Sequence, residues 1–413
     1  MTGDARPLAG QAWLHAPAVR KLLEALMARG RPARFVGGCV RDGLLGIDQA
    51  GDLDLATAER PEQVMALLEA AGLDAIPTGL AHGTVTSIAP GWRFEVTTLR
   101  CDVAPDGRHA VVEFTDDFRA DAARRDFTIN AMSCDGEGRL FDYFGGRADL
   151  AAGRVRFVGP ASQRIAEDYL RILRFFRFFA RYGRPPPDAE ALAACGAAAD
   201  RIAQLSGERV QAEMIKLLEA RDPLPALRLM ADGGVLAQVV AGPPALDRLA
   251  RLLALAPDAD ALLRLAAMLR GQDAAANELA SRWRLSSRDA ERLLALVQDP
   301  LPDLSAPPAE QRRVLHRLGA AHYGDLAHLA AAEDGGAALG EALAQASAWQ
   351  PKTLPLSGHD VMALGVAPGP AVGALLAKAE DWWVRHDFEP DHAACLTYVR
   401  DLLRRKHDTP ASP

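Results

Sequence analysis

Two carboxylates in the segment GDLDLA, residues 51–56, are the residues whose type and spacing point most directly to chemistry. In a β-strand, residues two apart point to the same face, so Asp52 and Asp54 would project together while Leu53 and Leu55 are buried on the other side. Neighbouring carboxylates repel each other unless a divalent cation lies between them. The pair therefore predicts metal-dependent phosphoryl transfer with two ions, one at the attacking oxygen and one at the phosphates and leaving group. Surface acids on an exposed edge strand are the alternative.

A glycine turn lies about fifteen residues before this pair, in the segment FVGGCVRD, residues 35–42. We expect a strand that runs into the Gly37-Gly38 turn and then a short helix that begins near Val40. Glycines let the backbone approach a phosphate closely, and a helix N-terminus adds exposed N–H groups with a favourable dipole. Arg41, one turn into the helix, could reach the same triphosphate. A plain tight turn is the alternative.

A third carboxylate is available on another expected strand. Glu95 lies in residues 93–99, a run rich in β-branched and aromatic residues. It is a candidate catalytic carboxylate near the metal ions. A polar residue that faces outward from the strand is an equally good reading.

Adjacent arginines followed by an aspartate mark the segment 121–132. One of these arginines could contact a phosphate. Asp126 and Asn130, four residues apart on a helical turn, could then fix its geometry. A helix-capping network is the alternative.

The pair Asp168 and Arg171, in the helical pattern EDYLRILR at residues 167–174, predicts selection of nucleobases without a template. Residues three apart share one face of a helix. A carboxylate accepts from the amino group of cytosine or adenine, and an adjacent arginine donates to their ring acceptors. Guanine and uracil place a carbonyl oxygen at the amino position, so the pair would admit C and A and reject G and U. A routine surface salt bridge is the alternative.

Arginine is concentrated between Arg119 and Arg184, where thirteen arginines and no lysine face eight acids, a local excess of about five positive charges. A guanidinium group suits phosphates and bases because its donors form a planar fork, although a solvated face with ion pairs is the alternative. Each step of three residues on a helix falls about 60° short of a full turn. Arg174 would therefore flank the Asp168 face, and Arg177 would be rotated to the opposite side; we assign both to nucleotide contact.

The elements that must position these residues change in kind along the chain. The first 150 residues mix β-branched and aromatic runs with glycine turns, which predicts strands at 34–36, 84–88 and 93–99 and helices at about 17–29 and 60–71. From about residue 161, leucine and alanine recur at helical spacing through 208–232, 246–270, 276–297 and 309–330. A sheet covered by helices should therefore be followed by bundle-like or solenoid helical packing.

Composition bounds the class of protein. With 413 residues, 49% hydrophobic and 24% charged, the chain is typical of a globular protein of two to four domains. Its five cysteines are widely spaced, which favours a reducing compartment. We find no apolar leader and no stretch long enough to cross a membrane, so we expect the cytoplasm and no membrane partner. The net charge of −7 argues against nonspecific coating of nucleic acid.

Taken in order, four of these segments (35–42, 52–54, 124–130 and 167–171) resemble the motifs of the bacterial class II CCA-adding enzymes. These are tRNA nucleotidyltransferases of the polymerase-beta-like superfamily and are closely similar to bacterial poly(A) polymerases. The resemblance covers roughly residues 30–215, and Gly207-Glu208-Arg209-Val210 with Glu213 resembles the neck motif of that family. Each motif is weak alone, but four in this order are specific.

The resemblance implies an α+β protein in four parts. These are a polymerase-beta-like nucleotidyltransferase head at 1–150 with a mixed sheet, an all-α neck at 151–220 that recognises the base, a helical body at 221–345 and a helical tail at 346–413 that binds tRNA. It implies two Mg²⁺ ions held by Asp52 and Asp54. The residues that match the family's nucleotide contacts are Gly38, Arg41, Arg125, Asp168, Arg171, Arg174 and Arg177, to which we add Gly37, Asp126 and Asn130.

Two further segments bear on the resemblance. The segment 100–117, with Pro105-Asp106-Gly107-Arg108, resembles the family's flexible loop, which helps to switch specificity from C to A. Some members carry a C-terminal HD-type phosphohydrolase domain, and His359-Asp360 and His386-Asp387 are dyads of that kind. Such a site also needs further spaced histidines and an aspartate, and residues 356–370 resemble instead the tail of members without this domain.

We therefore expect an enzyme that adds or repairs the 3′-terminal CCA of tRNA from CTP and ATP, without a template and with release of pyrophosphate. A poly(A) polymerase or a CC-only-adding enzyme is the nearest alternative, and a catalytically silent RNA-binding protein is the alternative from another class. The loop resemblance leans against CC-only addition, and the complete carboxylate pair speaks against a silent protein. The oligomeric state stays open.

Overall fold

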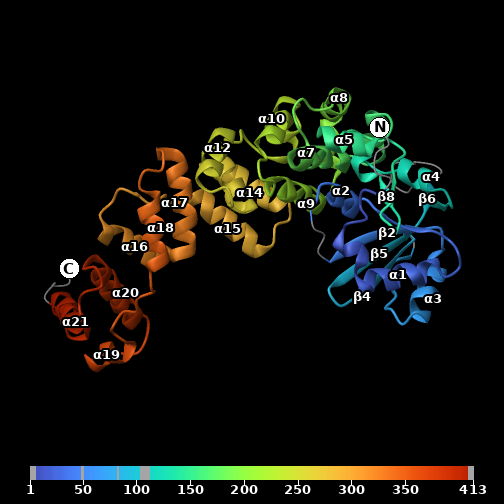
Figure 1. Cartoon of the computed structure of the whole chain (residues 1–413). Coiled ribbons are helices and arrows are strands. Elements are labelled where there is room, and N and C mark those ends of the chain that lie inside the picture. The colour runs from blue at the N-terminus through green and yellow to red at the C-terminus, as the bar shows by residue number, and fades with distance from the viewer. Residues whose placement is uncertain (1–5, 48–50, 81–82, 103–111, 408–413) are drawn as a thin grey trace. The chain divides into compact units, whose positions relative to one another are not determined.

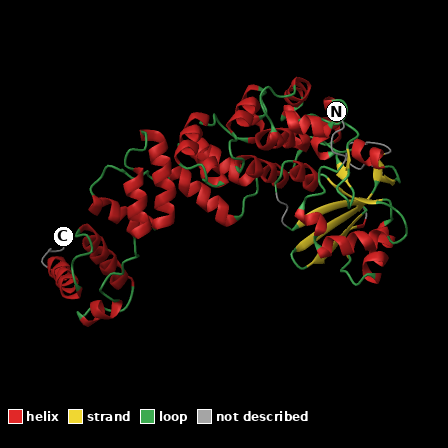
Figure 2. Cartoon of the chain, in the orientation of Figure 1, coloured by secondary structure: helices red, strands yellow, loops and turns green. Residues whose placement is uncertain are grey.

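The computed structural model describes residues 6–47, 51–80, 83–102 and 112–407. The chain forms two compact units, residues 1–243 with 278–285 and residues 244–277 with 286–413. The first unit contains a mixed sheet with helices, and within the described residues no strand follows residue 141 (Figure 2). This arrangement confirms the predicted α+β fold, with a sheet at the N-terminus and helices afterwards.

The main sheet of the first unit has seven strands in the order β3-β4-β5-β2-β1-β8-β9. Strands β2 and β5 pair in parallel, and the other pairs are antiparallel. A separate two-stranded ribbon pairs β6 with β7. The bounds are β1 Ala33–Val36, β2 Asp52–Thr57, β3 Ile76–Gly79, β4 Thr84–Ala89, β5 Trp92–Thr98, β6 Arg100–Asp102, β7 Val112–Phe114, β8 Ser133–Cys134 and β9 Leu140–Phe141.

Period-two alternation gives the central strands one buried face. Leu53 and Leu55 of β2 and Phe94 of β5 are almost completely buried. Helices α1 (Pro17–Met27) and α3 (Pro61–Ala70) pack against each other and against the sheet (Figure 1). Both begin with a proline. Proline suits the first helical turn because the N–H group that it lacks would have no intrahelical partner there. The predicted strands and helices of this region are therefore confirmed to within a few residues.

Of the remaining helices of the first unit, α2 and α4 lie between strands in the sequence and the others follow β9. Helix α7 carries a buried aromatic face, where Phe175 packs against Phe127 and Phe157. This cluster attaches α7 to the end of the head that carries the candidate site. The bounds are α2 Gly38–Leu44, α4 Phe118–Ala123, α5 Gly146–Ala152, α6 Ala161–Glu167, α7 Leu170–Tyr182, α8 Ala189–Ala197, α9 Gly207–Leu218, α10 Leu224–Asp232 and α11 Leu236–Val239.

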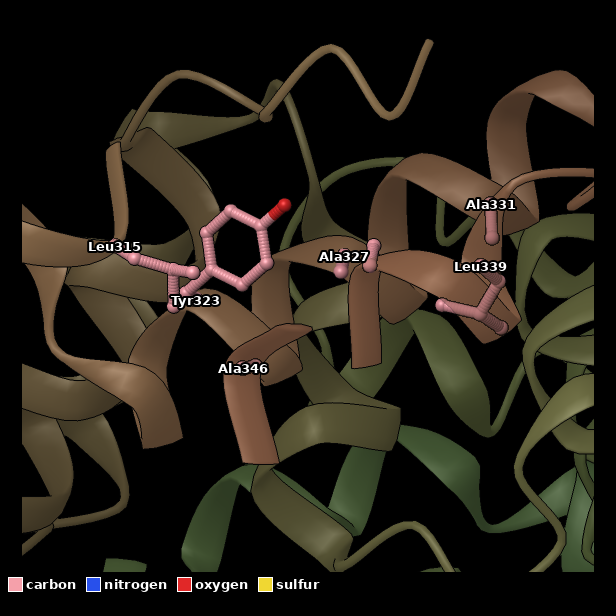
Figure 3. Close-up of a cluster of buried hydrophobic side chains, with 7 residues drawn as sticks. Leu315, Tyr323, Ala327, Ala331, Leu339 and Ala346 are labelled. Atoms are coloured by element: carbon pink, nitrogen blue, oxygen red, sulfur yellow. The ribbon is translucent and has the colours of Figure 1, made fainter. Parts of the chain in front are cut away.

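The second unit is built of helices with hydrophobic clusters between them. One cluster surrounds Tyr323, whose ring packs among leucine and alanine side chains (Figure 3). The Tyr323 hydroxyl donates to Gln311 Oε1 at 3.2 Å. Another cluster surrounds Trp383. The helices are α12 Leu246–Leu255, α13 Ala261–Leu269, α15 Ser287–Gln298, α16 Pro308–Leu318, α17 Ala320–Asp334, α18 Leu339–Ala348, α19 Gly358–Ala363, α20 Pro370–Arg385 and α21 His392–His407, and α14 (Asp273–Arg282) contributes residues to both units.

The two histidine–aspartate dyads lie in this second unit. Asp360 accepts from the Ser357 backbone N–H at 2.8 Å and caps helix α19, and it also pairs with His392 at 3.3 Å. Asp387 forms a two-point ion pair with Arg312. Both aspartates are therefore engaged in contacts that stabilise the helical packing.

Among the described residues, no helix is long and apolar enough to cross a membrane.

Candidate active site

A cavity of about 630 Å³ lies in the first unit, where β2 and β5 meet the glycine turn, the segment 124–130 and helices α7 and α9. We call it the arginine-lined cavity, because seven arginines and four carboxylates line it within the described residues. Its lining includes eleven of the thirteen predicted site residues: Gly37, Gly38, Arg41, Asp54, Glu95, Arg125, Asp126, Asn130, Asp168, Arg171 and Arg174. Asp52 and Arg177, which are both described, are not among its lining residues.

The carboxylates of β2 and β5 project from the same side of the sheet. Asp52, Asp54 and Glu95 are exposed, while Leu53 and Leu55 between them are buried, so the predicted alternation is confirmed. Asp54 lies directly opposite Glu95 in the parallel register. The pKa of Asp54 is raised, first by partial burial and then by the negative charge of Glu95, with Asp52 adding to the effect. Like charges are therefore held side by side here.

The glycine turn lies between two guanidinium groups. Gly37 has φ +71° and ψ −120°, a backbone conformation that glycine adopts without steric cost. A Cβ atom on Gly37 would lie 3.4 Å from Arg125 Nη1, and one on Gly38 would lie 3.7 Å from Arg41 Nη2. The helix begins at Gly38, two residues before the predicted start. Because neither glycine has a side chain, no atoms of the turn lie between its backbone and the two guanidinium groups.

Asp126 and Asn130 form the predicted pair, since Asn130 Nδ2 donates to Asp126 Oδ1 at 3.1 Å. Asp126 Oδ2 accepts from Arg174 Nε at 2.8 Å, and Asn130 Oδ1 accepts from Arg41 Nη1 at 2.5 Å. Burial opposes ionisation of Asp126, but Arg174 and the hydrogen bond from Asn130 outweigh it, so the pKa of Asp126 is lowered. The pair links two arginines on different sides of the cavity.

We expected Asp126 and Asn130 to hold one of the adjacent arginines at 124 and 125, but Asp121 holds both of those. Arg125 Nη2 donates to Asp121 Oδ2 at 3.1 Å, and Arg124 Nε donates to Asp121 Oδ1 at 2.9 Å. The sequence contains the signal for this, because Asp121 precedes the two arginines by three and four residues on helix α4 and its C-cap. Asp121 is thus a supporting residue that our sequence reading did not assign.

The expected single helix through residues 167–174 is broken at Asp168. Helix α6 ends at Glu167, Asp168 is extended with φ −157° and ψ 107°, and α7 begins at Leu170. The Asp168 carboxylate accepts from the Leu170 N–H at 3.1 Å, and aspartates disfavour helix interiors because of such local bonds. Arg171 pairs with Glu167 at 2.6 Å, and Asp168 pairs with Arg209 at 2.8 Å, so the anticipated alternative of an Asp168–Arg171 ion pair is wrong.

Arg174 and Arg177 both contact Glu213, and the expected rotation of Arg177 away from Asp168 does not apply because the helix is broken at Asp168. Arg174 lines the cavity, and Arg177 pairs with Glu213 of α9 at 2.5 Å. Glu213 is buried and lies 3.6 Å from Arg174 Nη1 as well. Glu213 therefore attaches this face of α7 to α9.

Some lining residues were not assigned from sequence. Arg209 was only part of the neck resemblance, yet it lines the cavity and pairs with Asp168. Arg100, at the start of the loop segment, also lines the cavity, whereas Pro105–Arg108 of that segment lie outside the described residues. The remaining unassigned lining residues are Val36, Leu55, Thr84, Thr97, Arg124, Leu170 and Phe178.

Known protein families and individual known proteins match this chain. Residues 33–156 match the family described as "Poly A polymerase head domain", and residues 187–249 match "Probable RNA and SrmB- binding site of polymerase A". The chain is 34% identical over 399 residues to "CCA tRNA nucleotidyltransferase 1, mitochondrial" of Mus musculus, covering 92% of this chain and 89% of that protein. It is 39% identical over 217 residues to "CCA-adding enzyme" of Geobacillus stearothermophilus, covering 52% of each.

Solved structures share the fold. A crystal structure of the Bacillus stearothermophilus CCA-adding enzyme in complex with CTP matches with a TM-score of 0.73 and 27% identity, covering 95% of this chain and 99% of that one. The Thermotoga maritima CCA-adding enzyme complexed with tRNA matches with a TM-score of 0.67 at 21% identity, covering 96% and 98%, and supports the fold alone. The family expected from the motifs is confirmed: the chain belongs to the CCA tRNA nucleotidyltransferases.

Proposed function

We propose that this enzyme completes or repairs the 3′-terminal CCA of tRNA from CTP and ATP, choosing each nucleotide with its own side chains and releasing pyrophosphate. One observation carries the proposal. A single cavity brings the Asp54 and Glu95 carboxylates, the glycine turn and the Asp168/Arg171 pair together. A nucleotide with its triphosphate at the turn would therefore have its phosphates beside the carboxylates and its base beside α7.

The carboxylates fit a divalent cation. Asp54 faces Glu95 in register, and the raised pKa of Asp54 reports a repulsion that a cation would relieve. Mg²⁺ is usually held by one or two carboxylates with waters and substrate phosphates, so the paired carboxylates of β2 would suffice as its protein ligands. We propose two Mg²⁺ ions on Asp52 and Asp54, with Glu95 as a third carboxylate.

When bound, the ions would activate the 3′-hydroxyl of tRNA and neutralise the phosphates. The chain's own arginines would orient the triphosphate. Arg41 and Arg125 flank the bare backbone of the glycine turn, and Arg174 extends the same positive lining toward α7. Because Asp121, Asp126 and their neighbours already hold these guanidinium groups, the arginines present donors in a fixed geometry to the triphosphate.

For base selection we propose that Asp168 and Arg171 read the Watson–Crick edge of C and A. Asp168 and Arg171 do not pair with each other, because Arg171 pairs with Glu167 and Asp168 pairs with Arg209. Asp168 Oδ1 accepts from the backbone and Oδ2 from Arg209, so each oxygen retains a lone pair for an amino group. Guanine and uracil would leave two acceptors facing each other, which is costly in a cavity.

The assay is incorporation of labelled CTP and ATP into a tRNA that lacks its terminal CCA. Addition of C, C and A in discrete steps supports the proposal, a long A tail indicates a poly(A) polymerase, and arrest after CC indicates a CC-only enzyme. No incorporation with any divalent metal would favour the silent RNA-binding protein.

Two variants separate the roles. Asp52→Ala should abolish transfer while tRNA affinity is unchanged, and retained turnover would contradict the metal assignment. Asp168→Ala should relax the choice of base, measured as incorporation of GTP or UTP relative to CTP, with a smaller loss of total transfer. Unchanged selectivity would remove Asp168 from base recognition.

Two further properties stay predictions. We propose the cytoplasm as the location, although three related proteins, from mouse, human and Danio rerio, carry "mitochondrial" in their names. We also retain the division into head, neck, body and tail at 1–150, 151–220, 221–345 and 346–413 as a proposal.

A further inference from the structure

Tyr182, the last residue of helix α7, reaches from the helical part of the first unit to the glycine turn of the head. Its hydroxyl donates to Asp42 Oδ1 at 2.8 Å, although the two residues are 140 positions apart in the chain. Its ring lies against the Arg41 guanidinium, with 4.3 Å between Arg41 Cζ and the ring centroid. Tyr182 thus contacts both members of one ion pair and is not itself a lining residue of the cavity.

Arg41 is held in a defined plane by these neighbours. Its Nε and Nη2 donate to the two oxygens of Asp42 at 2.8 and 3.0 Å, and its Nη1 donates to Asn130. In the described part of the chain, three of its five N–H groups are accounted for in this way. Nη2 also lies beside the Gly38 position, where we place the triphosphate.

The contacts of Tyr182 act on the two groups that fix this plane. A ring against the guanidinium face prevents it from tilting, and cation–π contacts of this kind favour one stacking geometry. The hydroxyl fixes the Asp42 carboxylate, which is itself buried and grips Arg41 at two points. Burial, with the charge of Asp42, raises the pKa of Tyr182 to about 12, so the phenol remains a hydrogen-bond donor over any ordinary assay range.

We propose that Tyr182 is a positioning residue for nucleotide binding, which orients Arg41 toward the triphosphate through its hydroxyl on Asp42 and its ring on the guanidinium. The inference rests on the proposed role of Arg41 in triphosphate binding. It predicts that the end of α7 affects how tightly a nucleotide is held, independently of which base the nucleotide carries.

The test compares Tyr182→Phe, which keeps the ring, with Tyr182→Leu, which removes ring and hydroxyl. We expect the KM for CTP and for ATP to rise by the same factor, about 3–10-fold for Phe and more than 10-fold for Leu. The kcat should stay within about twofold and the KM for tRNA should not change. Calorimetric titration with CTP and Mg²⁺ in the absence of tRNA should show the same order of affinities. If the Leu variant does not fold, the Phe variant carries the test.

Tyr143→Phe is the matched control. Tyr143 also hydrogen-bonds an arginine of the head, Arg34, at 3.0 Å, but Arg34 does not line the cavity. Loss of this hydroxyl should leave nucleotide KM unchanged. An equal rise in KM for Tyr143→Phe and Tyr182→Phe, or a fall in thermal stability of Tyr182→Phe with no change in KM, would overturn the proposal.

A double-mutant cycle with Arg41→Lys separates this inference from the proposed function. Lysine lacks the planar fork, so Tyr182→Phe should have little further effect in the Arg41→Lys background. If Arg41→Lys leaves nucleotide KM unchanged, the proposed role of Arg41 fails. If Arg41→Lys raises KM but Tyr182→Phe does not, or if the two effects multiply fully, only the role of Tyr182 fails.

Discussion

Asp54→Asn removes one of the negative charges that β2 and β5 hold side by side, and we expect the metal-free protein to become more stable as it loses activity. The two strands lie about 4.8 Å apart, and Asp54 and Glu95 are opposite each other in register. Two unit charges at this separation repel by about 1 kcal/mol in water and by about 3–4 kcal/mol at an effective dielectric of about 20. Because both side chains reach solvent, the lower figure applies. For a unit of this size, about 1 kcal/mol corresponds to a Tm increase of about 2–4 °C.

The raised pKa of Asp54 also predicts how the stability difference between Asp54→Asn and the wild-type protein changes with pH. The pKa of Asp54 is raised in the folded protein, so the folded state holds the Asp54 proton more strongly than the unfolded chain does. The protonated Asp54 carboxyl therefore contributes to the free energy of unfolding at low pH, and this contribution is lost as the pH rises through the raised pKa. The advantage of Asp54→Asn over the wild-type protein should therefore grow with increasing pH in EDTA.

Thermal unfolding with either EDTA or MgCl₂ is the assay, with tRNA-CCA addition measured on the same samples. MgCl₂ should stabilise the wild-type protein more than the variant, and addition should be lost in the variant. Asp74→Asn is the control, since Asp74 is an exposed acid of the head that does not line the cavity. An Asp54→Asn protein that is less stable than the wild type in EDTA, or that gains as much from MgCl₂, would refute the reasoning.

Asp126→Asn tests the contacts of the site, and Gly207→Ala, with Gly373→Ala as its comparison, tests helix packing. Asp126→Asn should lower the free energy of unfolding by about 1.5–3 kcal/mol near neutral pH, because the charged bonds from Asp126 to Arg174 are lost. Since the pKa of Asp126 is lowered, this loss of stability, measured by urea titration, should shrink as the pH falls below about 4. A loss that does not depend on pH would contradict the assignment. Gly207→Ala should lower the free energy of unfolding by about 1–3 kcal/mol, because the new Cβ would lie 1.9 Å from the Arg282 carbonyl oxygen. Gly373→Ala, whose Cβ would meet open space on helix α20, should instead raise the free energy of unfolding by about 1 kcal/mol. Equal effects at the two positions would refute this interpretation.

Patterns of short range were predicted well from sequence. The alternation in β2 follows from the period of a strand, so burial of Leu53 and Leu55 and exposure of Asp52 and Asp54 could be read directly. Such patterns need only local geometry.

Partners that come from distant segments could not be predicted in the same way. Asp126 meets Arg174 from 48 positions away, and Asn130 meets Arg41 from 89 positions away, so no local spacing reports either contact. The break at Asp168 was missed for a different reason. Its carboxylate competes for a backbone N–H group, and that local choice overrides the helical pattern of the flanking residues.

The way the arginines of the cavity are held has a consequence for transplanting the site. An arginine side chain carries about 2 kcal/mol of rotamer entropy. An arginine that is not held by other residues would lose much of this entropy when it binds a ligand. Here that loss has already occurred during folding, because buried or half-buried acids hold the guanidinium groups in place. An attempt to graft this nucleotide site onto another protein would therefore fail with the arginines alone. The residues that must move with them include Asp121, Asp126, Glu167 and Glu213, because these acids hold the arginines in place.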